Sequence, residues 1–131
     1  MTDHRAARVL VVDDEAPVRT FAARVLRDGG YEVAVASDGP EALRLIERDL
    51  SFDVYVLDVV MPEMMGDELA RRVQRMNRDA KVLYFTGFAD CLFRDRWSMG
   101  QHEAFLEKPV TRNGLLEAVS LLLCGRLQQR P

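Results

Sequence analysis

Apolar and polar positions along the chain follow two alternating patterns, one with the spacing of strands and one with the spacing of helices. Short runs rich in β-branched and other apolar residues predict five strands, at residues 8–12, 31–36, 54–57, 81–85 and 103–106. The run at 54–57 contains no charged residue, which is typical of a strand covered on both faces. Between the runs, apolar residues recur every three or four positions, and this spacing predicts a helix after each strand.

Residues that favour helix ends support the predicted helices. Gly29–Gly30 would end the first helix, and Asp38 and Glu41 have the spacing of a capping box at the start of the second. Thr111 would cap the last helix. The predicted fourth helix, within residues 88–99, has the loosest pattern of the five.

Five strands that alternate with five helices at this short spacing predict an α/β fold. We expect a doubly wound, five-stranded parallel sheet with helices on both faces, in the flavodoxin-like strand order 2-1-3-4-5. A chain of 131 residues corresponds to a single domain, residues 1–131. Its core is expected to run from about residue 8 to residue 123, with frayed polar ends.

Composition excludes several classes of function. A net charge of −3 with interspersed signs gives no electrostatic case for binding nucleic acid or a membrane surface. The polar start, Met1–His4, contains no apolar signal region, and no apolar run has the length of a membrane-spanning helix. Cys91 and Cys124 lack a CxxC spacing, so we expect reduced thiols in a cytoplasmic protein.

Polar residues stand where four predicted strands end, and these residues are Asp13, Asp14, Asp58, Thr86 and Lys108. Right-handed crossovers bring the carboxyl ends of parallel strands to one edge. Three carboxylates that converge there repel one another by about 3 kcal/mol per pair at an effective dielectric near 20, and a bound cation would remove that cost. A ligand set of oxygens favours Mg²⁺. Lys108 and Thr86 could then hold a phosphoryl group, which Asp58 could accept as an aspartyl phosphate.

Four motifs at these strand ends resemble the receiver domain of two-component response regulators: V-L-V-V-D-D-E, V-L-D-V-V-M-P-E-M-M-G, F-T-G and F-L-E-K-P. The resemblance extends over almost the whole chain. It implies that Asp58 is the phosphoacceptor and that Asp14 is a direct Mg²⁺ ligand. It also implies that Asp13 acts on the metal mainly through water, and that the backbone carbonyl of Val60 is a further ligand.

The same resemblance assigns roles to residues around the phosphoacceptor. Thr86 and Lys108 match the residues that hold the phosphoryl oxygens. Phe105 matches the aromatic switch position, which acts together with Thr86. Lys108 and Pro109 match a cis peptide bond that is usual in the family.

The implied function is that of a signalling switch, not of an enzyme with a separate substrate. Family members accept a phosphoryl group from a phosphohistidine on a sensor histidine kinase or a histidine phosphotransfer protein. They then shift the face built by the fourth helix, the fifth strand and the last helix, which is a possible site for a homodimer or an effector. Slow self-phosphorylation from small donors and slow self-dephosphorylation are expected. Val60 and Phe88 are expected to flank the attacking water, and neither side chain can orient it.

Other functions stay open alongside this one. A haloacid-dehalogenase-like phosphohydrolase uses similar groups, but it needs a second Asp two residues after the nucleophile, where this chain has Val60. A dinucleotide-binding module is weaker, because no glycine-rich loop follows the first strand. An unphosphorylated pseudo-receiver is disfavoured by the complete set of acids, Thr and Lys. Both a free-standing regulator and the receiver part of a longer protein, including a hybrid kinase, fit the sequence.

Overall fold

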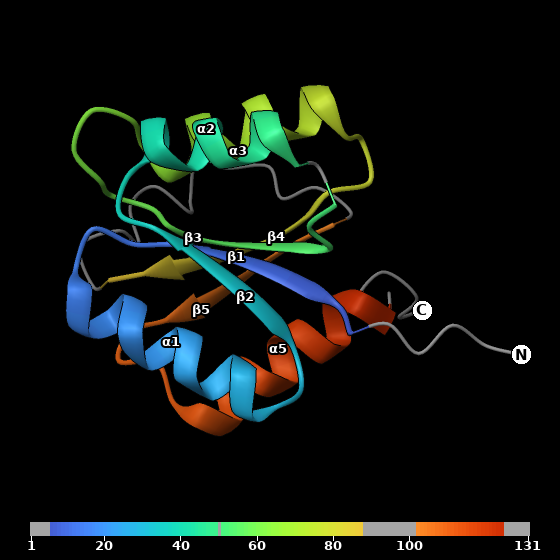
Figure 1. Cartoon of the computed structure of the whole chain (residues 1–131). Coiled ribbons are helices and arrows are strands. Elements are labelled where there is room, and N and C mark those ends of the chain that lie inside the picture. Colours follow the sequence, from blue (N-terminus) through green and yellow to red (C-terminus); the bar gives the residue numbers. More distant parts are fainter. Residues whose placement is uncertain (1–5, 50, 88–101, 125–131) are drawn as a thin grey trace, which may run out of the picture.

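The computed structural model describes residues 6–49, 51–87 and 102–124 and shows a sheet between two layers of helices (Figure 1). The strands are β1 (Arg8–Val12), β2 (Glu32–Ala36), β3 (Val54–Asp58), β4 (Lys81–Thr86) and β5 (Glu103–Glu107). The helices in this part of the chain are α1 (Ala16–Asp28), α2 (Gly39–Arg48), α3 (Gly66–Met76) and α5 (Arg112–Cys124). All strand pairs are parallel, in the order β2-β1-β3-β4-β5. The predicted doubly wound, flavodoxin-like fold is therefore confirmed.

One predicted element cannot be compared with the structure. The fourth helix, together with Phe88, falls within residues 88–101, which lie outside the described part of the chain. Among the described residues, no helix is both long enough and apolar enough to cross a membrane.

The sheet is covered on both faces, and β3 lies at its centre. Every residue of β3 is buried, as its uninterrupted apolar run predicts. Helices α2 and α3 cover one face of the sheet, and α1 and α5 cover the other (Figure 1). Alternate residues of β3 contribute to the two layers of core, with Tyr55 and Leu57 on the α2–α3 side and Val54 and Val56 on the α1–α5 side.

The predicted capping residues of α2 and α5 form hydrogen bonds to the helix ends, but one bond of the predicted capping box has a different partner. Asp38 caps α2 by accepting a hydrogen bond from the backbone N–H of Glu41 at 2.8 Å. The Glu41 carboxylate does not return the bond to Asp38, because it accepts from the backbone N–H of Ser37 at 2.7 Å and from the Ser37 hydroxyl at 2.9 Å. Thr111 caps α5 through a bond of 3.0 Å from the N–H of Gly114. The capping box predicted for α2 is thus displaced by one residue.

Helical spacing alone does not settle which side chains are buried. Phe21 lies one position before the buried pair Ala22 and Ala23 of α1, yet 40% of its surface is exposed. Met76, at the end of α3, is also 40% exposed. Both residues are at the border of their helix's apolar stripe, where a rotation of a few tens of degrees decides between core and solvent.

Candidate functional site

The fold brings the predicted site residues together at the carboxyl edge of the sheet. Asp13 follows β1 directly, Asp58 is the last residue of β3 and Thr86 is the last residue of β4. Lys108 follows β5, and its backbone N–H donates to the carbonyl of Thr86 at 2.8 Å. The parallel register therefore sets these four side chains on neighbouring strand ends, as the crossover argument predicts.

Three carboxylates converge at this edge. One ligand oxygen from each of Asp13, Asp14 and Asp58 can be chosen so that all lie within 4.8 Å of one another. Asp13 is fully buried and Asp58 is 4% exposed, whereas Asp14 is exposed. At such distances, each like-charge pair costs about 3 kcal/mol for an effective dielectric near 20. The cluster is thus electrostatically unfavourable unless positive charge is supplied.

Lys108 supplies the first positive charge. Its Nζ lies 3.3 Å from Asp58 Oδ1, 3.4 Å from Asp13 Oδ2 and 3.1 Å from Glu15 Oε1. Burial lowers the pKa of Lys108, but its hydrogen bond to Glu15 and the charges of Asp58 and Asp13 outweigh burial and raise the pKa. The ammonium group therefore stays charged, although one such charge cannot balance four carboxylates.

The shortage of positive charge is reflected in the raised pKa values of the two buried acids, Asp58 and Asp13. Burial raises the pKa of Asp58, the charge of Asp13 raises it further, and Lys108 only partly opposes them. Burial also raises the pKa of Asp13, against the opposing effects of a hydrogen bond from the Glu15 N–H and of Lys108. Both carboxylates would accept a further cation, since it would favour their charged forms.

Two buried oxygen atoms at the site accept or donate no hydrogen bond within the described part of the chain. These are Oδ2 of Asp13, which has only its 3.4 Å ion pair with Lys108, and Oγ1 of Thr86. Buried polar atoms are normally satisfied, so such exceptions call for a physical explanation. The Asp13 atom fits a hydrated or bound cation, and the Thr86 hydroxyl fits a donor to an incoming anionic oxygen. These residues therefore fit Mg²⁺ and a phosphoryl group.

The loop between β3 and α3 is held tightly against Asp58. The N–H of Gly66 donates to the carbonyl of Val59 at 2.7 Å, and a Cβ atom on Gly66 would lie 2.2 Å from the carbonyl oxygen of Asp58. Glu63 adopts a positive φ of 71°, which is uncommon for a residue other than glycine. Val60, two residues after Asp58, has 45% of its surface exposed. The role of its carbonyl as a metal ligand stays a prediction.

The predicted switch residue Phe105 lies on the edge strand β5 and packs against its neighbour β4. Its ring stacks on that of Tyr84, with 5.2 Å between centroids and 25° between planes. The Tyr84 hydroxyl donates to Oε2 of Glu103 at 3.3 Å. The peptide bond between Lys108 and Pro109 is cis.

Two residues of the site were not anticipated from the sequence. Glu15 provides the shortest of the three contacts to Lys108, and the Nη1 of Arg19 donates to the backbone carbonyl of Asp13 at 2.7 Å. The signal for Glu15 was its place directly after the acidic pair. Arg19 carries no such signal, because its role depends on the first turn of α1 folding back over the β1 end.

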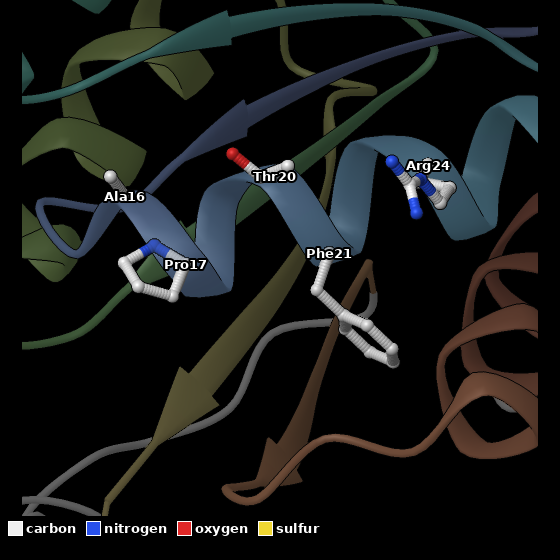
Figure 2. Close-up of a pocket in the computed structure, with 5 residues that line it drawn as sticks. All are labelled: Ala16, Pro17, Thr20, Phe21 and Arg24. Atoms are coloured by element: carbon white, nitrogen blue, oxygen red, sulfur yellow. The ribbon is translucent and has the colours of Figure 1, made fainter.

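Helix α1 also carries a hollow beside this edge. The hollow has a volume of about 410 Å³ and is lined by one side of the helix, with Pro17 and Phe21 as its apolar surface (Figure 2). The other lining residues are Ala16, Thr20 and Arg24. Since α1 begins three residues after Asp13, the Ala16–Pro17 end of this surface is the end nearer to the carboxylate cluster.

Comparison with known proteins gives one family. Residues 9–120 match the family model described as the response regulator receiver domain. The chain is 30% identical over 116 residues to the response regulator receiver protein CpdR of Brucella abortus, an alignment that covers 88% of this chain and 96% of CpdR. It is 36% identical over 119 residues to the sensor kinase CckA of the same organism, which covers 90% of this chain but 13% of CckA.

Other similarities agree with this family. The response regulator MprA of Mycobacterium leprae is 35% identical over 116 residues, covering 88% of this chain and 50% of MprA. A response regulator receiver protein from Sinorhizobium medicae has a solved structure that superposes with a TM-score of 0.84 at 28% identity, covering 95% of this chain and 99% of that one. The chain thus spans nearly all of some relatives and half or less of others. It belongs to the family of response regulator receiver domains.

Proposed function

We propose that the protein is a phosphorylatable switch in which Asp58 accepts a phosphoryl group from a phosphohistidine, with Mg²⁺ bound by Asp13, Asp14 and Asp58. The observation that carries this proposal is the pairing of a buried acceptor with unsatisfied groups. Asp58 lies 3.3 Å from Lys108 Nζ, and the buried Thr86 hydroxyl has no hydrogen-bond partner among the residues that the structure describes. A carboxylate, an ammonium and a hydroxyl in one place are the parts needed to accept and hold a phosphoryl group.

The chain's residues divide the work of transfer between them. A carboxylate oxygen of Asp58 attacks phosphorus, a P–O bond forms, and the P–N bond to the donor imidazole breaks, so the imidazole nitrogen keeps the electron pair. Lys108, which pairs with Asp58 before transfer, can move its contact to a phosphoryl oxygen, and the Thr86 hydroxyl can donate to another. When bound, Mg²⁺ would neutralise negative charge on the carboxylates and the phosphoryl oxygens.

Response to phosphorylation is proposed to start at Thr86. If Thr86 moves to donate to the phosphoryl group, the end of β4 changes, and Phe105 on the neighbouring strand β5 can repack against Tyr84. The face used for output would include β5 and α5, as well as the fourth helix predicted from the sequence. We propose that this face binds an effector or a second copy of the chain.

The proposed partner is a sensor histidine kinase or a histidine phosphotransfer protein, and we place the exchange in the cytoplasm. We propose that a protein donor that reaches Asp58 from the carboxyl edge also contacts α1, on the surface around Pro17 and Phe21 that Figure 2 shows. The alternative of a dedicated phosphohydrolase has no supporting group at the position two residues after Asp58. Val60 stands there, and its side chain cannot move a proton.

Intact-mass measurement tests the acceptor assignment. The protein is incubated with acetyl phosphate and Mg²⁺, and a gain of one phosphoryl mass is expected. The gain should be absent with chelator and absent in Asp58→Asn. Asp79→Asn is the matched control, because Asp79 is exposed and distant in the fold from the carboxyl edge, at the turn before β4. Phosphorylation of Asp58→Asn at the wild-type level would refute the assignment, and no phosphorylation of wild type would favour the pseudo-receiver.

A further inference from the structure

Strand β2 is an edge of the sheet, and part of its backbone faces outward. The N–H of Glu32 donates to the carbonyl of Ala7 at 3.0 Å, and the carbonyl of Ala36 accepts from the N–H of Asp13 at 3.3 Å. In a parallel ladder these bonds place the backbones of residues 32, 34 and 36 toward β1. The backbones of Val33 and Val35 therefore point away from the sheet. Such an edge can pair with an added strand.

Five arginines flank this edge, three on α1 and two on α2. They are Arg19, Arg24, Arg27, Arg44 and Arg48, and we call them the arginine edge. The three on α1 line a hollow of about 210 Å³ together with Val35, which is 38% exposed. The two on α2 line a second hollow of about 180 Å³.

None of the five arginines forms an ion pair with a carboxylate in the part of the chain that the structure describes. Some arginines elsewhere are paired, such as Arg71 and Arg72 on α3, which contact Asp67 and Glu68 at 3.2 and 3.0 Å. Two arginines of the edge are instead oriented by backbone carbonyls. Arg19 donates to Asp13 at 2.7 Å, and Arg27 donates to Val33 at 3.1 Å.

Three acidic side chains near this edge already have other partners, although Glu41 also lines the hollow on α2. The pKa of Glu41 is lowered chiefly by the hydrogen bonds that Ser37 donates to its carboxylate, and to a smaller extent by the charges of Arg44 and Arg19. Glu32 pairs with Arg8 at 3.5 Å, and Asp28 pairs with Arg112 at 3.4 Å. A protein whose net charge is −3 therefore presents one edge with concentrated positive charge.

We propose that the arginine edge is a docking surface for an acidic, extended segment of a partner protein, which adds to β2 as a further strand. Unpaired cations around an open strand repel basic segments and favour an acidic one. The N–H groups of Val33 and Val35 and the carbonyl of Val35 provide backbone partners for it. The side chains of an extended segment alternate between the two faces of a sheet. Arginines stand on both faces, so the segment that fits has consecutive acidic residues.

The probe is a fluorescein-labelled octaglutamate peptide, and its binding to the full chain is followed by fluorescence polarisation at low ionic strength. Arg27→Glu/Arg48→Glu changes one arginine on each face and is expected to weaken binding about tenfold or more. Arg75→Glu/Arg78→Glu is the matched control. It makes the same change in net charge at the end of α3, where neither arginine has an ion-pair partner among the described residues, and binding should change less than about twofold.

Backbone pairing is tested separately from charge. An octaglutamate peptide that is N-methylated at alternate residues keeps its charge but loses half of its N–H donors, and it should bind about tenfold more weakly. In amide NMR spectra, the resonances of Val33 and Val35 should shift on addition of the unmodified peptide. Urea unfolding of each variant, monitored by circular dichroism, checks that the fold is intact.

Several results would overturn the proposal. These are an absence of octaglutamate binding, equal weakening by the two double variants, or equal binding of the N-methylated peptide. A single-stranded oligonucleotide of the same charge is the comparison ligand. If it bound more tightly than octaglutamate, and Arg27→Glu/Arg48→Glu weakened that binding, the partner of this edge would be a nucleic acid and not a protein segment. All measurements are made without Mg²⁺ or phosphodonor, so their outcome is independent of whether Asp58 is the phosphoacceptor.

Discussion

At the scale of single residues, the site is defined by charges that the fold forces together. Asp58 is delivered by a strand buried on both faces, so its carboxylate cannot turn away into solvent without breaking the strand's packing. Its compensation comes from Lys108, which also contacts Asp13 and Glu15. One cation shared by several anions leaves the site short of positive charge, and a bound metal ion would supply that charge.

Because the site is short of positive charge, we expect that removing one of its buried carboxylates stabilises the protein. With chelator present, Asp58→Asn should raise the free energy of unfolding by about 1–2 kcal/mol, because a buried charge and its repulsion with Asp13 are removed. The sign follows from the raised pKa of Asp58, which shows that burial and Asp13 disfavour its charged form more than Lys108 favours it. Urea midpoints with and without Mg²⁺ give the measurement.

The control is Asp79→Asn, which removes an exposed carboxylate and should change stability by less than about 0.5 kcal/mol. The proposed Mg²⁺ would bind the folded site and not the unfolded chain, so it should stabilise wild type more than Asp58→Asn. The difference between their free energies of unfolding should then be smaller with Mg²⁺ than with chelator. A variant that is less stable than wild type in chelator would contradict the clustered-charge description.

We expect the Val60 side chain to influence the lifetime of the phosphorylated state. Its exposed side chain cannot orient a water for attack on the phosphoryl group, so Val60→Asn should speed hydrolysis by about tenfold, or 1.4 kcal/mol in barrier. Adding Phe88→Glu, at the second position predicted to flank the water, should increase the rate further. Phosphate release is followed after the donor is removed, in excess Mg²⁺.

Val35→Asn provides the comparison for Val60, since Val35 is likewise exposed but belongs to the edge strand β2. Its decay rate should match that of wild type. If Val60→Asn also decays at the wild-type rate, the water is not positioned from this side of the site.

At the scale of elements, the strands were predictable because their cause is local. An apolar, β-branched run bounded by polar residues can be recognised without knowing its neighbours, and the bounds of all five predicted strands are within one residue of those observed. The converging site could be predicted for the same reason, since parallel strands fix where their last residues go. Glu15 and Arg19 could not, because their contacts depend on how α1 leaves β1. The exposure of Phe21 depends in the same way on the rotation of α1 against the sheet.

Gly66 links the site to the start of α3, and its substitution should damage both. A Cβ atom there would lie 2.2 Å from the carbonyl oxygen of Asp58, and that backbone cannot move without shifting β3. Gly66→Ala should therefore destabilise the protein by about 3 kcal/mol or more. It should also reduce labelling of Asp58 by acetyl phosphate under conditions where the variant is still folded.

Gly29→Ala is the matched substitution. At Gly29 the added Cβ would lie 2.6 Å from a terminal methyl group of Leu116, which is the flexible end of a side chain. Its cost should be less than about 1 kcal/mol, and urea midpoints of the two variants measure the contrast. Equal costs would mean that the β3–α3 loop can relax around Gly66.

At the scale of the whole molecule, the two layers of core have different origins along the chain. The layer under α2 and α3 is formed mainly by the middle of the sequence, together with Leu10 and Val12 of β1. The layer under α1 and α5 joins its two ends, because α5 packs Leu115, Val119 and Leu122 against residues of β1, β3 and β4. The last helix is therefore required to cover the sheet, whatever part it also has in signalling.

This arrangement predicts where the folding unit ends. A chain of residues 6–124 keeps both layers and should unfold in one transition, within about 0.5 kcal/mol of the full chain. A chain that stops at Val110 lacks three buried side chains worth about 1.5–3 kcal/mol each, a loss comparable to the whole stability of a small domain. It should be unfolded without urea. Far-ultraviolet circular dichroism and Trp97 fluorescence would follow the transitions. A loss of more than about 2 kcal/mol for residues 6–124 would show that the outer residues belong to the folding unit.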